Sequence, residues 1–158
     1  PGGKPMDDLA QQSAGGVYEL PRAQISGCAL DMSFSGLKTA VVNLAHNAAQ
    51  KGQELDRAAL AADFAAAVSD ELVPRTIAAA RQAGRQVIVA AGGVAANTRV
   101  RADLERACRE AGYTLYLPPL RWCGDNGAMI GAQGYYEYMA GHVAGWELNA
   151  YATRDISE

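Results

Sequence analysis

The stretch QVIVAAGGVAANTRVRADLERA, residues 86–107, decides the fold of this chain. It begins with Val87–Val89, a short β-branched run that is typical of a buried strand. Gly92 and Gly93 interrupt the run, and Asn97 is a candidate N-cap for a helix whose apolar residues follow at helical spacing. A strand, a glycine turn and a helix N-terminus in this order can bind an anion through backbone N–H groups. The same order also occurs in α/β proteins that bind nothing there, so the residues alone leave both interpretations open.

The composition is that of an ordinary globular protein. The chain has 158 residues, 49% of them hydrophobic and 20% charged, with a formal net charge of −3. It contains no apolar run of about 18 residues, so we expect no transmembrane helix and no membrane partner. The opening Pro-Gly-Gly-Lys is not a secretory signal, and it lacks an initiator methionine, so we expect a piece of a longer protein or a processed product.

Charge and cysteine content narrow the functional classes. The acidic balance gives no overall nucleic-acid footprint, and the arginines of residues 99–109 alternate with acids, which favours a solvated helix surface. The three cysteines, Cys28, Cys108 and Cys123, form neither a disulfide framework nor a zinc-finger spacing. Cys108 lies on the apolar stripe of its helix and is predicted to be core. A reducing, cytoplasmic location fits best.

The periodicity predicts alternating strands and helices. We expect strands at residues 31–35, 86–90 and 113–117, and helices at residues 6–12, 37–49, 60–81, 98–110 and 126–139. Pro74 predicts a kink or a restart within the third of these helices, and Gly112 predicts the end of the fourth. The pattern indicates an α/β fold with helices packed on a small mixed sheet, forming a single domain over residues 1–158. Sites in such sheets lie at the carboxyl ends of the strands, here residues 33–38, 92–97 and 123–126.

Each of these three segments has a structural interpretation. Residues 33–39, SFSGLKT, lack the spacing of a phosphate-binding P-loop, so a helix start capped by Ser35 or Gly36 is favoured. Asp125 could cap the last helix or ligate a metal, and its spacing alone favours the cap. The two histidines, His46 and His142, form no paired metal-binding motif, and no serine-hydrolase motif is present.

Taken together and in this order, SFSGLKTAV (33–41), AGGVAANTRVR (91–101) and CGDNGAMI (123–130) resemble the carboxyl-terminal half of the tRNA threonylcarbamoyladenosine transferase family. That family was formerly labelled O-sialoglycoprotein endopeptidase or glycoprotease. The opening PGGKPMDDLA is similar to the family's stretch just past mid-chain. The resemblance implies an ASKHA fold of the actin and sugar-kinase type, with two ribonuclease-H-like lobes. The chain would then be most of the second lobe, without its first strands.

The resemblance also implies a reaction and a set of site residues. Threonylcarbamoyl-adenylate would be the substrate, and its threonylcarbamoyl group would pass to the adenosine beside the anticodon of tRNA. Gly3 and Asp7 match the family's positions that hold the ribose, and the glycine turn and Asn97 match those that contact the nucleotide. Asp125 matches an acidic ligand of the family's iron or zinc.

The departures from the family pattern carry their own expectations. The family's His-x-x-x-His metal pair and its Ser-Gly-Gly-His-Thr loop are absent from these residues. We therefore expect Asp125 to bind metal weakly or not at all, and the chain alone to be inactive. Implied partners of the parent enzyme are tRNA, a dimerising paralogue and a small ATPase, with self-association through an exposed lobe face as a further possibility. A metal-dependent glycoprotease domain and a non-catalytic interaction module are the alternatives.

Overall fold

A computed structural model describes residues 2–22, 27 and 29–153, so Cys28 lies outside the described residues. The chain divides into two compact units, residues 1–124 and residues 125–158, and each is described by itself. The expectation that residues 1–158 form a single domain stays a prediction.

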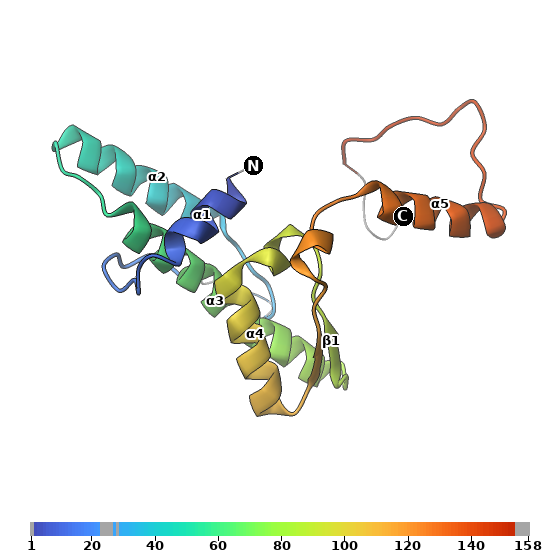
Figure 1. The fold of residues 1–158 in the computed structure, drawn as a ribbon, viewed down its shortest axis with the longest axis horizontal. Helices are drawn as coiled ribbons and strands as arrows, with labels where there is room; N and C mark the ends of the chain where they lie inside the picture. Colours follow the sequence, from blue (N-terminus) through green and yellow to red (C-terminus); the bar gives the residue numbers. More distant parts are fainter. Residues whose placement is uncertain (1, 23–26, 28, 154–158) are drawn as a thin grey trace. The chain divides into compact units, whose positions relative to one another are not determined.

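The described part of the first unit contains four α-helices and two strands (Figure 1). The helices are α1 (Gly3–Ala10), α2 (Ser35–Gln50), α3 (Arg57–Gln82) and α4 (Thr98–Ala111), and the strands are β1 (Val87–Val89) and β2 (Thr114–Tyr116). Short 3-10 helices, η1 (Gly93–Ala96) and η2 (Leu120–Trp122), follow the two strands. The described part of the second unit contains one helix, α5 (Gly127–Met139).

The stretch that decides the fold forms a parallel β–α–β unit. Strands β1 and β2 pair in parallel, with Val87 opposite Thr114, Ile88 opposite Leu115 and Val89 opposite Tyr116. Helix α4 makes the crossover, which parallel strands require because a tight hairpin cannot join them. The predicted α/β class, with helices packed against a small sheet, is confirmed. Within the described residues the sheet is parallel rather than mixed, since its two strands are joined by this crossover.

Helix α4 begins and ends where its sequence predicts. The Asn97 side chain accepts a hydrogen bond from the Val100 N–H, which is the expected N-cap contact. Gly112 ends the helix in the left-handed conformation at φ +72°, and the next residue, Tyr113, donates back to the Cys108 carbonyl at 2.8 Å. These two ends fix α4 between the glycine turn and β2.

The core lies where α3 and α4 pack together. Val73 of α3 and Val100 and Leu104 of α4 are buried in one cluster, and Leu115 of β2 packs against it. A second cluster joins α2 and α3 through Leu37 and Ala67. Cys108 is only 1% exposed, so its predicted core position is confirmed, and burial raises the pKa of its thiol.

Three local predictions are corrected. Residues 31–34 are not a strand, and α2 begins at Ser35; a strand needs a ladder partner, and none lies beside this segment in the described residues. The N-cap position of α2 is Phe34, which makes no side-chain capping hydrogen bond, rather than Ser35 or Gly36, because both of these residues already lie in the first helical turn. Helix α3 runs through Pro74 as one helix, so the predicted restart is wrong, and the alternative of a kink stays a prediction; the buried Val73 beside Pro74 packs against α4 and stabilises the continuous helix.

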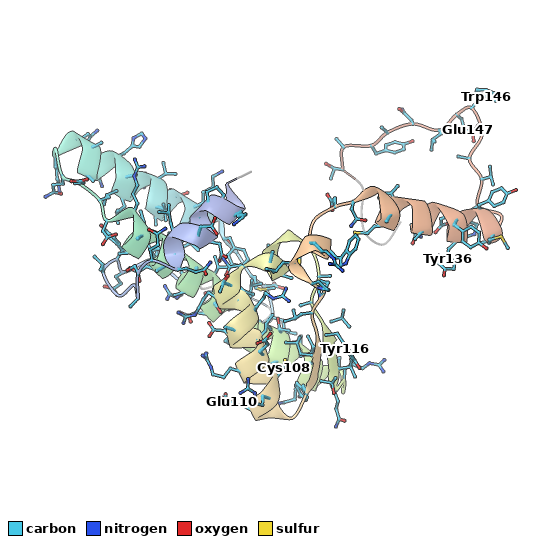
Figure 2. The ribbon with its side chains drawn as sticks, in the orientation of Figure 1. Cys108, Glu110, Tyr116, Tyr136, Trp146 and Glu147 are labelled. Carbon is cyan, nitrogen blue, oxygen red and sulfur yellow. The ribbon has the colours of Figure 1, made fainter. Side chains whose placement is uncertain are left out.

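The second unit exposes its apolar side chains. Asn126 is the N-cap of α5 and accepts from the Met129 N–H at 3.1 Å. No residue of α5 is buried, and Figure 2 shows Tyr136 on this helix and Trp146 in the following segment projecting outward. Among the described residues, no helix is long and apolar enough to cross a membrane.

Candidate functional site

The glycine turn after β1 presents its backbone to open space. Gly92 has φ +86° and ψ 175°, a conformation that is essentially restricted to glycine. A Cβ atom added at Gly92 or Gly93 would meet nothing within 4 Å. The second glycine is therefore not required by packing or by a positive φ. The turn can accept a group that approaches the backbone closely, which a side chain at either position would obstruct.

Asn97 joins this turn to α4. Its side-chain oxygen accepts from the Val100 N–H at 3.0 Å, and its own N–H donates to the Val94 carbonyl at 3.0 Å. The cap thus engages the oxygen of the side chain, and the amide N–H₂ is the part that can donate to a ligand. Since the positive end of the α4 dipole lies here, an anion near this position is stabilised.

Asp7 of α1 lies against the same helix end, although it is 91 residues away in the sequence. Its Oδ1 accepts from the Thr98 N–H at 2.9 Å, and its Oδ2 accepts from the Thr98 hydroxyl at 2.7 Å. Gln11 is the third donor to this carboxylate, and its side-chain N–H₂ bonds Oδ2 at 3.2 Å. Two of the sequence-predicted site segments are therefore brought together, one from α1 and one from the glycine turn and its helix. Gly3 precedes Asp7 by four residues, which places it on the same face of α1, and it borders open space.

Arg101 holds the turn to the segment after β2. Its guanidinium donates to the Ala95 carbonyl at 2.8 Å and to the Pro118 carbonyl at 3.0 Å, and Cys123 Sγ lies 3.6 Å from it. The planar, forked guanidinium can bond two carbonyls at once. This arginine is engaged inward, so the prediction of a merely solvated arginine face does not hold for it.

Asp103 connects α4 to α3. It is buried and accepts from the Ser69 hydroxyl at 2.6 Å and from Arg99 Nε at 2.5 Å, with Arg106 2.7 Å away. Burial by itself would raise the pKa of this carboxyl, but the hydrogen bonds from Ser69 and Arg99 and the two positive charges hold it below the ordinary range. The ionised carboxylate therefore fixes α4, and the glycine turn with it, against α3.

A second buried carboxylate anchors the chain between α1 and α2. Asp63 of α3 accepts from the backbone N–H groups of Gly16, Val17 and Tyr18, at 2.5, 3.0 and 2.7 Å. Burial opposes ionisation of Asp63, but the three N–H donors outweigh it, and the pKa of the carboxyl lies below its ordinary range. This cluster fixes the segment that follows α1 and so the position of Asp7.

Asp125 belongs to a different unit from Asp7, Asn97 and the glycine turn. It is exposed and belongs to the second unit, where Asn126 and not Asp125 caps α5. The interpretation of Asp125 as the helix cap is therefore wrong, because the next residue has the extended backbone of an N-cap. In the described parts of the chain, no three His, Cys, Asp or Glu side chains group closely enough to hold a metal ion. The segment 33–38 begins α2 and contributes Leu37 to the core, which is a structural role.

Sequence reasoning missed Thr98, Asp63 and Ser69. Each acts through a contact made with residues more than 30 positions away, and no local motif signals such a contact. The pair Gly15-Gly16 was the one available hint, because adjacent glycines can present consecutive N–H groups to an anion.

The parallel β–α–β unit, with its glycine turn between β1 and the crossover helix α4, places the chain among α/β proteins. The comparisons define the family. A model of the TsaD family, described as tRNA N6-adenosine threonylcarbamoyltransferase, matches residues 1–132, and the chain belongs to this family. The mixed α/β architecture is consistent with a partial ASKHA lobe.

Curated relatives carry the same description. The tRNA N6-adenosine threonylcarbamoyltransferase of Moorella thermoacetica is 45% identical over 150 residues, covering 95% of this chain and 44% of the relative. That of Staphylococcus saprophyticus is 42% identical over 158 residues, covering 100% and 46%. That of Streptococcus equi subsp. equi is 47% identical over 150 residues, covering 95% and 44%. The chain thus spans less than half the length of these relatives.

Proposed function

We propose that this chain supplies the nucleotide-binding half of a tRNA N6-adenosine threonylcarbamoyltransferase. The observation that carries the proposal is the convergence of Asp7, Asn97 and the open glycine turn on the N-terminus of α4, supported by the family membership. An adenylate has hydroxyls that need acceptors and a phosphate that needs donors. In the proposal, the Asp7 carboxylate supplies the acceptors, and the Asn97 amide and the backbone of the glycine turn supply the donors.

Each residue has a defined role in the proposal. Gly92 and Gly93 let the nucleotide approach the backbone, and the Asn97 amide donates to it. Asp7 accepts from a ribose hydroxyl, and Gly3 leaves room beside it on α1. The helix dipole of α4 favours the phosphate. These residues bind and orient the adenylate, and none of them is assigned as a general acid or base.

The proposed reaction is an acyl transfer. The exocyclic amine of the tRNA adenosine forms a bond to the carbamoyl carbonyl carbon, the bond from that carbon to the phosphate oxygen breaks, AMP leaves with the electron pair, and the amine releases one proton to solvent. Tight positioning of the adenylate helps because a well-held leaving group lowers the entropic part of the barrier. Enzymes hold such groups with donors that are fixed before the reaction begins.

The metal of the reaction is not explained by these residues. We propose Asp125 as one ligand of an iron or zinc ion, but a structural or catalytic zinc site needs three or four protein ligands. A single exposed carboxylate does not meet that requirement, so no step is assigned to a metal here. We accordingly propose that the 158-residue chain alone does not transfer threonylcarbamoyl. Detection of transfer by the purified chain would contradict this.

The remaining partners are proposals of the same kind. The whole enzyme would act on tRNA, in the cytoplasm, together with a dimerising paralogue and a small ATPase. Exposed apolar side chains support a tendency to self-association: in the first unit Val89 is 70% exposed, and in the second Ile130 is 73% exposed. A rise of molecular mass with concentration would support it. The glycoprotease and interaction-module alternatives gain no support from the names of the relatives.

Equilibrium binding of AMP to the chain tests the proposal. We expect weak binding, with a Kd of about 1 mM, because only one wall of the site is represented in these residues. Asn97→Asp keeps the N-cap, since Asp caps as well as Asn, but replaces the amide donor with a negative charge. This variant should fold normally and lose AMP binding, whereas Asn149→Asp, the same change at an exposed position of the second unit, should bind like the unaltered chain. Equal binding by both variants would refute the assignment of Asn97.

A further inference from the structure

Thr98 makes two hydrogen bonds to the Asp7 carboxylate. Both carboxylate oxygens of Asp7 are used, one by the Thr98 N–H at 2.9 Å and the other by its hydroxyl at 2.7 Å. Thr98 is the first residue of α4 and follows the capping Asn97 directly. A single residue at the helix start therefore fixes both the position and the rotation of a carboxylate that comes from α1.

The hydrogen-bonding capacity of Asp7 is nearly used up by these contacts. An ionised carboxylate has about four lone-pair positions. Thr98 occupies two of them and Gln11 a third, on Oδ2, at 3.2 Å. The remaining position is on Oδ1, the oxygen that accepts only from the Thr98 N–H. Asp7 is thus held in one orientation with one acceptor position open, as recognition of a hydroxyl group requires.

The two bonds from Thr98 differ in what they depend on. The N–H bond is made by the backbone and persists with any side chain except proline. The hydroxyl bond depends on threonine or serine. Without it, Oδ2 keeps only the longer contact to the exposed Gln11 side chain. The carboxylate could then turn about its terminal torsion, which is broad and has a low barrier.

We propose that Thr98 is a positioning residue for ribose recognition: its hydroxyl and N–H orient the Asp7 carboxylate so that Oδ1 accepts from a ribose hydroxyl of the bound adenylate. This rests on the proposed function. Thr98 itself need not touch the nucleotide. It determines how well the site distinguishes a ribose from a sugar without hydroxyls.

The experiment compares binding of AMP and 2′,3′-dideoxy-AMP to the full 158-residue chain by titration calorimetry or NMR. The unaltered chain should prefer AMP, and Asp7→Asn should reduce that preference most. Thr98→Val keeps the shape of the side chain without the hydroxyl and should lower the preference by about threefold to tenfold, since hydrogen bonds to charged groups are among the stronger ones. Thr98→Ser restores the hydroxyl and should restore the preference.

The control removes a threonine hydroxyl elsewhere. Thr76 of α3 donates to the Leu72 carbonyl at 2.8 Å, and Thr76→Val should leave the preference unchanged. A purely structural role of Thr98 would weaken both ligands equally and leave their ratio intact, which would overturn the inference. If Thr98→Val does not fold, Thr98→Ala replaces it with the same expectation. Absence of AMP binding by the unaltered chain would refute the proposed function and this inference together, whereas normal binding with an unchanged ratio in the variant would refute this inference alone.

Discussion

Asp63→Asn is the change whose effect on stability is most directly determined by the structure. The variant keeps the size of the side chain and removes its charge. In the native chain this buried carboxylate receives three backbone N–H groups, from Gly16, Val17 and Tyr18. An asparagine oxygen can accept two of them, and its N–H₂ group would then face the third donor. The segment that positions α1, and with it Asp7, should therefore loosen.

The magnitude follows from the hydrogen bonds. A bond to a charged group contributes about 1.5–3 kcal/mol and a neutral bond about 0.5–1.5 kcal/mol. Asp63→Asn loses one bond entirely and about 1 kcal/mol of charge assistance on each of the other two, while relief of the burial cost of the charge returns about 1 kcal/mol. The net loss is about 2.5–4 kcal/mol. For a chain of this size that lowers Tm by roughly 5–16 °C.

Urea unfolding of the two variants Asp63→Asn and Asp70→Asn provides the assay and its control. Asp70 lies two turns further along α3 and pairs with Arg22 at 2.6 Å, but both side chains are over 40% exposed. Exposed ion pairs contribute about 0–1 kcal/mol, so Asp70→Asn should be nearly neutral. Equal stability of the two variants, or a loss below about 0.5 kcal/mol for Asp63→Asn, would refute the hydrogen-bond account.

Further variants test the turn and its supports. Gly92→Ala should lower the free energy of unfolding in urea by about 1–3 kcal/mol, because φ at this position is +86°. Gly93→Ala should leave the free energy of unfolding unchanged and weaken AMP binding, since its Cβ would enter only open space. The reverse result would contradict the geometry. Arg101→Lys should lower the free energy of unfolding by about 1–2 kcal/mol, because an ammonium group cannot donate to both carbonyls as the planar guanidinium does. An unchanged midpoint of urea unfolding would argue against this role of Arg101. Asp103 has a lowered pKa in the folded chain, so its stabilisation is present above the ordinary Asp value of about 3.9 and is lost as pH falls below it. The pKa of Asp63 is lowered as well, so Asp103→Asn should flatten this acid limb of the stability curve in part, and an unchanged limb would exclude Asp103 as one of its sources.

The elements with strong local signals could be predicted from the sequence. The strand at Val87–Val89, the Asn97 cap and the Gly112 stop each depend on chemistry within a few residues, and the structure confirms all three elements. The expected burial of this strand holds for Ile88 but is wrong for Val87 and Val89, which are 54% and 70% exposed. Residues 31–35 could not be assigned correctly, because whether such a run pairs depends on a neighbouring strand that the local sequence does not reveal. Pro74 shows the same limit in a helix, since packing of its neighbours overrides the local preference.

The candidate site could be predicted in part. The glycine turn and Asn97 follow from strand, turn and cap rules, and the resemblance added Gly3, Asp7 and Asp125. That Asp7 lies against the start of α4 depends on how α1 packs, with a partner 91 residues away, and no periodicity indicates it. The roles of Thr98 and Asp63 arise from the same tertiary packing. The hydrogen bond from the Ser69 hydroxyl to the Asp103 carboxylate of α4 is also evident only in the structure.

The central claim is that an adenylate binds at the N-terminus of α4, beside Asp7, Asn97 and the glycine turn. NMR titration of the isotopically labelled chain with AMP tests this claim most directly. We predict saturable shifts confined to the amides of Asp7, Gly92, Gly93, Asn97 and Thr98 and their immediate neighbours. Shifts absent up to about ten times the expected Kd of about 1 mM would contradict the claim. So would shifts concentrated instead in a pocket elsewhere in the first unit, which is lined by Leu44 and Ala48 of α2 and by Leu55.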